Sequence, residues 1–154
     1  MRRGSWAAYA WAAPTTLLGL VAVALTGPSW RVVDGVLEAH GAGVARLLDT
    51  VAPHRRVLAM TLGHVVLGRD AVALDDTRAH ERVHVRQAER WGPFFVPAYL
   101  AASVVARAQG GEPYADNAFE REAWRAAPVP APRLSPAATC APVGQPSRRH
   151  FTRV

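Results

Sequence analysis

Two histidines and a glutamate near the middle of the chain form the pattern H-E-x-x-H, at His80, Glu81 and His84. On an α-helix, residues four positions apart lie one above the other on the same face. Both imidazoles can therefore bind one metal ion while Glu81 lies beside them. The pattern is typical of zinc hydrolases. The alternative interpretation is a surface helix on which two histidines coincide without a metal.

The pattern is expected to lie on a helix over residues 77–91. Asp75 and Asp76 precede this segment, and carboxylates at a helix N-terminus accept hydrogen bonds from free backbone amides and suit the helix dipole. Gly92 and Pro93 are expected to end the helix, because neither residue favours its continuation. The sequence thus predicts a helix of about four turns around the pattern.

The predicted helix also carries a row of basic residues at every fourth position: Arg78, Arg82, Arg86 and Arg90. Counted at about 100° per residue, this row lies on the side of the helix opposite His80 and His84. Like charges in a row are tolerated where water surrounds them. We therefore expect a solvated arginine face and a histidine pair that faces the interior.

Catalytic zinc usually has three protein ligands and keeps one position for water, so a third ligand is required. The single cysteine, Cys140, lies in a proline-rich segment far from the pattern, which leaves carboxylates as candidates. Glu120 is the first choice and Glu122 the alternative. Asn117 lies three residues before Glu120, as in a helix capping box, so a capping role for Glu120 is the competing interpretation.

Charged residues are absent from residues 4–30, which follow Arg2 and Arg3. Residues 5–26 are apolar and long enough, at about 1.5 Å per residue, to cross a roughly 30 Å hydrocarbon layer. We expect residues 1–29 to be an uncleaved anchor of a single-pass protein of the cell membrane. A cleaved signal peptide with residues 17–25 as its apolar region is the alternative. The arginines before the anchor favour an extracytoplasmic domain.

Residues 30–70 are rich in β-branched residues separated by glycine, which is typical of strands and turns. Residues 30–40 and 57–67 are each predicted to be a strand, and residues 44–51 are a further candidate strand. A small antiparallel sheet is expected. A free edge of such a sheet can bind an extended peptide through its unpaired backbone groups.

Two further helices are expected after the pattern, over residues 94–108 and 118–126. The first has Pro97 in its first turn and is too short to cross a bilayer, so we expect it to pack against the helix of the pattern. Residues 127–154, rich in proline and arginine, are predicted to be a disordered tail. The fold class is therefore α+β, with residues 30–126 forming one domain of a small sheet and about three helices.

Composition argues against nucleic-acid binding. The net charge is +6, yet all eighteen basic residues are arginines, which are scattered along the chain and do not alternate with aromatic residues. The partners expected from the sequence are a membrane and a peptide or protein substrate. Nothing in the sequence indicates an obligate protein partner or a cofactor other than Zn²⁺.

The segments H-E-R-V-H-V-R-Q, W-G-P-F-F and N-A-F-E-R-E-A resemble the gluzincin metallopeptidases, in particular small bacterial zincin-like membrane proteins. Gluzincins carry the third zinc ligand as the glutamate of E-x-x-A on a later helix, and residues 120–123 fit that form. The resemblance covers about residues 62–125. It implies a zincin-like helical core in which His80, His84 and Glu120 bind Zn²⁺ and Glu81 is the general base.

This chain departs from the family at Trp124, where related proteins often have an aspartate that hydrogen-bonds a ligand histidine. Asp116 or a backbone carbonyl would have to take that role. The resemblance implies hydrolysis of peptide bonds by zinc-activated water, with Glu81 transferring the proton to the leaving amine. Tyr114, Tyr99 or His64 could donate a second hydrogen bond to the oxyanion, although a histidine in an apolar strand is more often structural.

The alternative hypothesis keeps the fold and the metal without turnover. In this interpretation the chain is a catalytically inactive zincin-like membrane protein with a structural or interaction role. Its small size favours this alternative, because few residues remain to form a substrate cleft.

Overall fold

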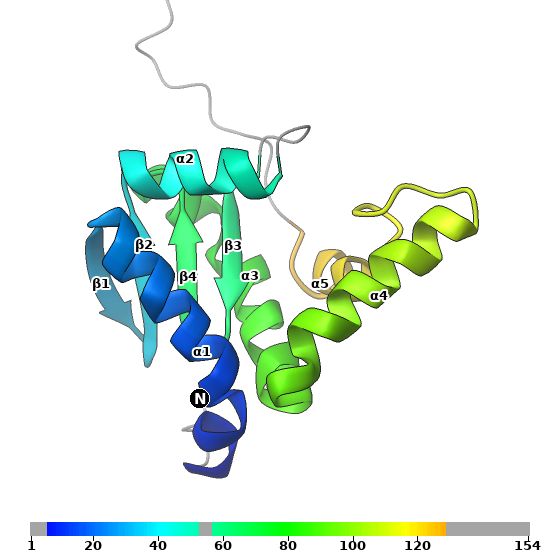
Figure 1. Cartoon of the computed structure of the whole chain (residues 1–154), viewed down its shortest axis with the longest axis horizontal. Coiled ribbons are helices and arrows are strands. Elements are labelled where there is room, and N and C mark those ends of the chain that lie inside the picture. The colour runs from blue at the N-terminus through cyan, green and yellow to red at the C-terminus, as the bar shows by residue number, and fades with distance from the viewer. Residues whose placement is uncertain (1–5, 53–56, 129–154) are drawn as a thin grey trace, which may run out of the picture.

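The computed structural model describes residues 6–52 and 57–128, which form a four-stranded sheet with helices on both faces (Figure 1). An N-terminal apolar helix, a small sheet and a helical second half confirm the α+β class. The elements, in chain order, are α1 (Trp6–Thr26), β1 (Ser29–Val33), β2 (Val36–His40), α2 (Ala42–Val51), β3 (Ala59–Leu62), β4 (Val65–Gly68), α3 (Ala71–Trp91), the 3₁₀ helix η1 (Gly92–Phe94), α4 (Phe95–Ala108) and α5 (Ala118–Ala126). Apart from its first two residues, the predicted tail lies outside the described residues.

The sheet has the order β1-β2-β4-β3 and consists of two antiparallel hairpins joined by a parallel central pair, β2 and β4, so it is mixed and not antiparallel throughout as predicted. Residues 30–40 and 57–67 are thus hairpins, and the prediction of one strand in each was wrong. Asp34 and Gly35 make the first turn in the left-handed region, at φ 51° and 79°. Asp-Gly is a strong hairpin signal, because both central residues of such a turn require positive φ.

Residues 44–51 were predicted as a possible strand, but they lie in helix α2. Parallel pairing of β2 with β4 requires a crossover connection, and α2 forms part of it. Val44 and Leu48, four residues apart, are fully buried against the sheet. Their spacing is helical, and it explains why this short apolar segment does not form another strand.

Helices α1 and α2 cover one face of the sheet, and α3 covers the other (Figure 1). Ala39, Val65 and Leu67 point toward α1 and α2, whereas Val36 and Val66 point toward Leu74 and Val85 of α3. Successive side chains along a strand point to opposite faces of the sheet, so each strand contributes to the apolar core on both sides. This is expected for a sheet that helices cover on both faces.

Helix α3 begins six residues earlier than predicted. Its N-cap is Asp70, whose carboxylate accepts a hydrogen bond from the backbone N–H of Ala73 at 2.7 Å. Asp75 and Asp76 therefore lie inside the helix, and the prediction that they cap it was wrong. The helix ends at Trp91, where Gly92 takes φ 56°, as the Gly-Pro pair indicated.

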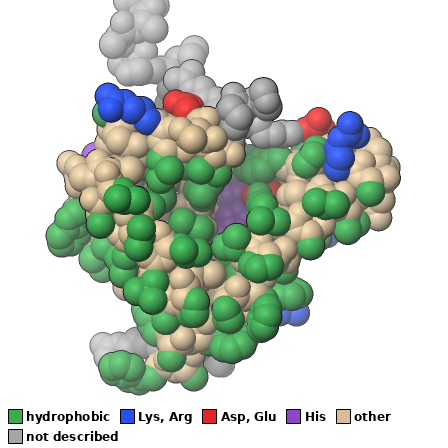
Figure 2. Space-filling model, in the orientation of Figure 1, with side chains coloured by type: hydrophobic (Ala, Val, Ile, Leu, Met, Phe, Trp, Pro, Cys, Tyr) green, Lys and Arg blue, Asp and Glu red, His purple; other side chains and the backbone are tan. Residues whose placement is uncertain are grey.

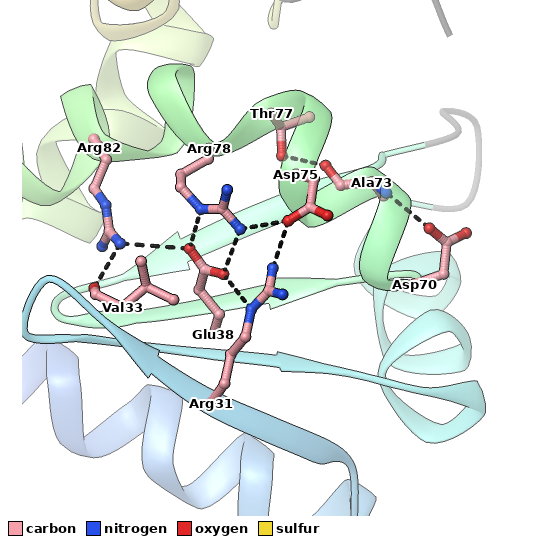
Figure 3. Close-up of polar contacts among 9 residues, drawn as sticks. All are labelled: Arg31, Val33, Glu38, Asp70, Ala73, Asp75, Thr77, Arg78 and Arg82. Atoms are coloured by element: carbon pink, nitrogen blue, oxygen red, sulfur yellow. Dashed lines mark hydrogen bonds and ion pairs between the residues drawn. The ribbon is translucent and has the colours of Figure 1, made fainter. Parts of the chain in front are cut away.

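The arginine row of α3 is only partly solvated, contrary to the sequence prediction (Figure 3). Arg78 and Arg82 extend to Glu38 of β2, a fully buried carboxylate that also accepts a hydrogen bond from Arg31 of β1. The distances to Glu38 are 2.8 Å from Arg78 Nε and 3.0 Å from Arg31 Nε. Half of the row thus joins α3 to the sheet, which could not be inferred from the helix alone.

A substitution of Glu38 by Gln is expected to lower the free energy of unfolding by on the order of 2–3 kcal/mol at pH 7. Burial opposes ionisation, but Arg78 and Arg31 outweigh it and hold the pKa of Glu38 below its usual range. A carboxylate with a lowered pKa stabilises the fold above the pKa of the unfolded chain, and this stabilisation is lost as pH falls. Urea unfolding in detergent at pH 7, 5 and 3 measures this stabilisation, and Glu112→Gln, at an exposed position, is the control. An unchanged pH dependence in Glu38→Gln would contradict the assignment.

Helices α4 and α5 complete the domain beside α3. Helix α4 extends away from the sheet as an arm, and α5 returns the chain to α3 (Figure 1). Both helices have the bounds that the sequence predicted to within one residue. Because α5 packs against α3, the glutamates of α5 are brought close to the histidines of the pattern.

Candidate metal site

His80, His84 and Glu120 form a buried cluster between α3 and α5. His80 Nε2 lies 3.2 Å from His84 Nε2 and 3.3 Å from Glu120 Oε2, and His84 Nε2 lies 3.4 Å from Glu120 Oε1. Each residue offers one potential ligand atom, and these three atoms lie within 4.8 Å of one another. The residues are 3%, 6% and 3% exposed, in chain order. The structure therefore brings together the two histidines and the glutamate selected from the sequence as its first choice.

Asn117 positions Glu120 by holding the start of α5. Its side-chain oxygen accepts a hydrogen bond from the N–H of Phe119, and its amide nitrogen donates to the backbone oxygen of Tyr99 and to Ser103 Oγ on α4. The N–H of Asn117 donates to the carbonyl of Tyr114 rather than to Glu120. Glu120 is therefore not the partner in a capping box, and its carboxylate points toward the histidines.

Gln87 determines which nitrogen of His84 carries the proton. Its amide nitrogen donates to the carbonyl oxygen of Phe119 at 3.1 Å and to Glu122 Oε2 at 3.0 Å, so its oxygen faces His84. That oxygen lies 2.8 Å from His84 Nδ1 and accepts a hydrogen bond from it. His84 thus has its proton on Nδ1 and a lone pair on Nε2, which points into the cluster.

His80 has the same arrangement through a different partner. Its Nδ1 lies 3.4 Å from the carbonyl oxygen of Ala127, which can only accept, so Nδ1 carries the proton. Trp124 occupies the position where an aspartate was expected, and its ring packs against His80 at a centroid distance of 4.9 Å. A backbone carbonyl therefore fills the orienting role, whereas Asp116 accepts from the N–H of Glu112.

These assignments test whether the cluster fits a metal ion. When both imidazoles are neutral and protonated on Nδ1, two imidazole lone pairs and a carboxylate face one another, and buried acceptors in this arrangement are unfavourable unless a cation, either a metal ion or a proton, lies between them. Zn²⁺ binds imidazole nitrogen and carboxylate oxygen in three-residue sites, with the other imidazole nitrogen hydrogen-bonded as here. The donor set therefore fits zinc.

Protons compete for the same atoms. Burial alone would lower the pKa of His84, but the hydrogen bond to Glu120 and the charges of Glu81 and Glu120 raise it above its ordinary value. Burial likewise opposes ionisation of Glu120, yet hydrogen bonds from His80 and His84 outweigh this effect and lower its pKa to about 2. Glu120 is thus ionised at neutral pH.

Glu81 lies beside the cluster as a second buried carboxylate. Its Oε2 accepts a hydrogen bond at 2.7 Å from the hydroxyl of Thr61, which belongs to edge strand β3. Burial raises the pKa of Glu81, and this effect exceeds the lowering by His84 and Thr61. A carboxylate with a raised pKa takes up a proton more readily than an ordinary glutamate, as a general base must.

The remaining candidates lie outside the group of three. The carboxylate of Glu122 accepts a hydrogen bond from Gln87, the residue that also contacts His84, and does not itself belong to the group. The hydroxyl of Tyr99 contacts the cluster, donating to Glu120 Oε1 at 2.6 Å. Tyr114 lies half-buried in the loop before α5. His64 contacts Glu89, Thr16 and the ring of Tyr9, which agrees with the structural role favoured for it.

Sequence reasoning missed Gln87 and Thr61. Gln87 could have been found, because it lies three residues after His84 and seven after His80, on the same face of α3. Thr61 had no comparable signal. Its distance of 20 residues from Glu81 is bridged only by the packing of β3 against α3.

A hollow lies between the body of the molecule and the arm of α4 (Figure 2). Figure 2 shows histidine atoms and an acidic side chain at the floor of the hollow. A separate groove of about 460 Å³ lies between α4 and α5, and its lining includes Ala102, Arg121 and Arg125 but none of the three cluster residues. The chemistry of the cluster therefore identifies the site better than the size of the neighbouring groove.

Comparisons of the chain with protein-family models, curated proteins and solved structures found no match.

Gln87→Leu is expected to weaken zinc binding by roughly 10- to 100-fold, because His84 loses the partner that orients its ring. Titration against a chelator of known zinc affinity measures the dissociation constant. Glu122→Gln is the matched control, since it changes the other partner of Gln87 and leaves the bond to His84. Equal zinc affinity in Gln87→Leu and the parent protein would contradict this role.

Proposed function

We propose that this chain is a membrane-attached zinc-dependent peptidase in which His80, His84 and Glu120 hold the metal and Glu81 is the general base. One observation carries the proposal. Three buried acceptor atoms converge on one point, and a second buried carboxylate with a raised pKa lies next to them. The resemblance of this segment to gluzincins supports the same assignment.

Zinc, when bound, supplies Lewis-acid activation of water, whose pKa it lowers toward about 7. The chain's own residues perform the proton transfers. Glu81 takes the proton from the attacking water and then delivers it to the nitrogen of the departing amine. The hydroxyl of Thr61 holds the Glu81 carboxylate in place, and the hydrogen bond from Tyr99 does the same for Glu120.

Strand β3 is the feature that favours a peptide as substrate. It forms one edge of the sheet, and the hydroxyl of its Thr61 contacts Glu81 directly. An extended peptide paired with the free side of β3 would run past the general base, with its backbone held by hydrogen bonds. Side-chain preference would then depend on the residues that line the hollow beside α4.

The N-terminal helix supports attachment to a membrane. Helix α1 is long and apolar enough to cross a bilayer, a property that signal sequences share. We propose that it is retained, because Ala12, Thr15 and Gly19 are buried against the domain and cleavage would expose their contacts. A single-pass anchor with an extracytoplasmic domain is the form of attachment that the sequence predicts.

A catalytically inactive zincin-like membrane protein is the second candidate. The observation that favours it is the near-complete burial of all three cluster residues, which restricts the approach of a substrate carbonyl. Trp124 further covers the ring of His80. In this alternative the metal would hold α5 against α3, as structural zinc sites do.

The proposal is tested with the full chain purified in detergent. Zinc content is measured by elemental mass spectrometry, and cleavage of a mixed peptide pool by liquid chromatography with mass detection. Zinc together with zinc-dependent cleavage supports the peptidase. Zinc without cleavage of any peptide favours the structural role, and absence of zinc after reconstitution would exclude both.

A further inference from the structure

Helix α1 contacts the domain along almost its whole length. Near its start the ring of Tyr9 stacks on His64 at 4.1 Å, and in its middle Thr16 accepts a hydrogen bond from the N–H of His64. At its end Thr26 lies so close to Gly43 of α2 that a Cβ there would be 2.4 Å from the carbonyl oxygen of Thr26. The helix is therefore part of the folded domain rather than a separate stalk.

Close packing extends to the end of α3, the helix that carries His80 and His84, and to the sheet. A Cβ on Gly92 would lie 2.5 Å from the ring of Trp11, whose indole N–H donates to the carbonyl of Arg90 at the end of α3. A Cβ on Gly19 would likewise lie 2.6 Å from the Cβ of Val65 in β4. A helix held at both ends and in the middle cannot cross a bilayer unless the sheet and α3 enter the hydrocarbon with it.

The domain is unsuited to such insertion. The face of the sheet remote from α1 carries the ion-pair network of Arg31, Glu38, Asp75 and Arg78, in which Arg31 and Asp75 are exposed (Figure 3). Charged side chains in hydrocarbon are costly unless they face a water-filled cavity or a protein interior. The network therefore indicates that this face lies in water.

The opposite face is apolar. Along α1 the exposed side chains include Leu18, Val21 and Leu25, the last 81% exposed, and α1 contains no charged residue. Helix α4 adds Leu100 and Val104, the latter 68% exposed. Figure 2 shows hydrophobic side chains across both the body and the arm on one face of the molecule, with charged groups mainly at its margins. Apolar surface of this extent marks an interaction site.

We propose that the apolar face formed by α1 and α4 docks into the interfacial layer of a lipid bilayer, with α1 lying along the membrane surface instead of crossing it. Hydrocarbon fits this face better than a protein does, because α1 has the apolar length of a membrane span while its opposite side packs on the domain. The exposed Arg107 in the last turn of α4, and the net positive charge of the chain, suit anionic headgroups.

This orientation deepens the proposed function and, in that respect, rests on it. The hollow with histidine atoms at its floor opens on the face that shows these apolar side chains (Figure 2). A docked domain would present its site to the membrane surface. The substrates of the proposed peptidase are then protein segments that lie at the lipid interface, such as the ends of membrane helices.

Depth measurement with the full chain tests the docking. Single cysteines replace Leu18, Leu25 or Val104 in a Cys140→Ser background, are labelled with an environment-sensitive fluorophore, and are reconstituted with phosphatidylcholine and phosphatidylglycerol vesicles. Ala79→Cys, exposed on α3 behind the sheet, is the aqueous control. Lipids carrying a nitroxide near the headgroup or near the chain end serve as shallow and deep quenchers.

If the face docks, the shallow quencher lowers the emission of all three labels at least about twofold more than the deep quencher does. The three labels then lie at one common depth. A crossing helix predicts a deep Leu18 label and a Val104 label in water, which would overturn the proposal. If the labels are quenched neither by the nitroxide lipids nor by a quencher dissolved in the water, a protein covers the face. That result would also overturn the proposal. Because quenching needs neither zinc nor turnover, failure of docking is distinguishable from failure of the peptidase proposal.

Discussion

Glu81→Gln is expected to lower the rate of peptide cleavage by roughly 10²- to 10⁴-fold while zinc remains bound. Glutamine has the shape of glutamate and can still accept the hydrogen bond from Thr61, but it cannot take up a proton from water. The cluster of His80, His84 and Glu120 makes no hydrogen bond through the Glu81 side chain, so its metal affinity should change little. Zinc content and single-turnover cleavage are measured on the same preparation.

Glu89→Gln is the matched control for this substitution. Glu89 lies on the same helix and contacts His64, away from the cluster, so its loss should leave the cleavage rate within about twofold of the parent protein. Cleavage by Glu81→Gln at the parental rate would remove Glu81 from the mechanism. Loss of zinc from that variant would instead show that Glu81 takes part in binding.

The pH profile provides a second measure of the same residue. Because burial raises the pKa of Glu81, cleavage should begin to fall at a pH above the value of about 4.3 that is ordinary for glutamate. Below that point Glu81 is protonated and no longer acts as a base. The raised pKa of His84 acts in the same direction, since a proton on its ring excludes the metal. Zinc content at each pH separates the two causes.

Glu120→Gln is expected to abolish the increase in melting temperature that zinc produces. A metal present at about a thousand times its dissociation constant stabilises the folded state by about 4 kcal/mol. For a domain of this size that corresponds to a shift of roughly 10–20 °C. The amide cannot provide the anionic ligand, and the increase should disappear together with the bound zinc. Thermal unfolding with and without zinc, followed by circular dichroism, measures both states.

Glu122→Gln distinguishes the two glutamates of α5. It lies two residues from Glu120, and its carboxylate contacts Gln87 instead of the histidines. The zinc-dependent increase should therefore persist in this variant. If Glu122→Gln loses the increase and Glu120→Gln keeps it, the ligand assignment is wrong. If neither variant nor the parent protein responds to zinc, the cluster is not a zinc site.

Local patterns accounted for much of the site. The spacing of His80 and His84 placed both rings on one face of a helix, and the apolar and charged neighbours indicated that this face is interior. The Gly-Pro pair after α3 and the bounds of α5 were also readable, because capping and helix termination depend on residues within one turn. Glu120 was the first choice for the third ligand and Glu122 the alternative, and the contacts of α5 favour Glu120.

Predictions failed where a distant partner decided the outcome. The crossover role of residues 44–51 follows from the parallel pairing of β2 and β4, which no window of the sequence reveals, although the four-residue spacing of Val44 and Leu48 was a local helical signal. Arg78 and Arg82 turned from a predicted water-facing row to the buried Glu38, 40 and 44 residues away. The hairpin within residues 30–40 was missed for another reason, since Asp34-Gly35 is a local turn signal. The hairpin within residues 57–67 turns at Gly63, which has φ 63°.

The sequence by itself determined the chemistry that is available: two imidazoles one helical turn apart, carboxylates beside them and downstream, and an apolar N-terminal helix. These features follow from residue type and from spacing within one element. Only the tertiary structure decided that Glu120 faces the histidines, that Gln87 and the carbonyl of Ala127 orient their rings, and that α1 packs along the domain. Each of these contacts joins elements whose relative positions depend on the burial of the whole core.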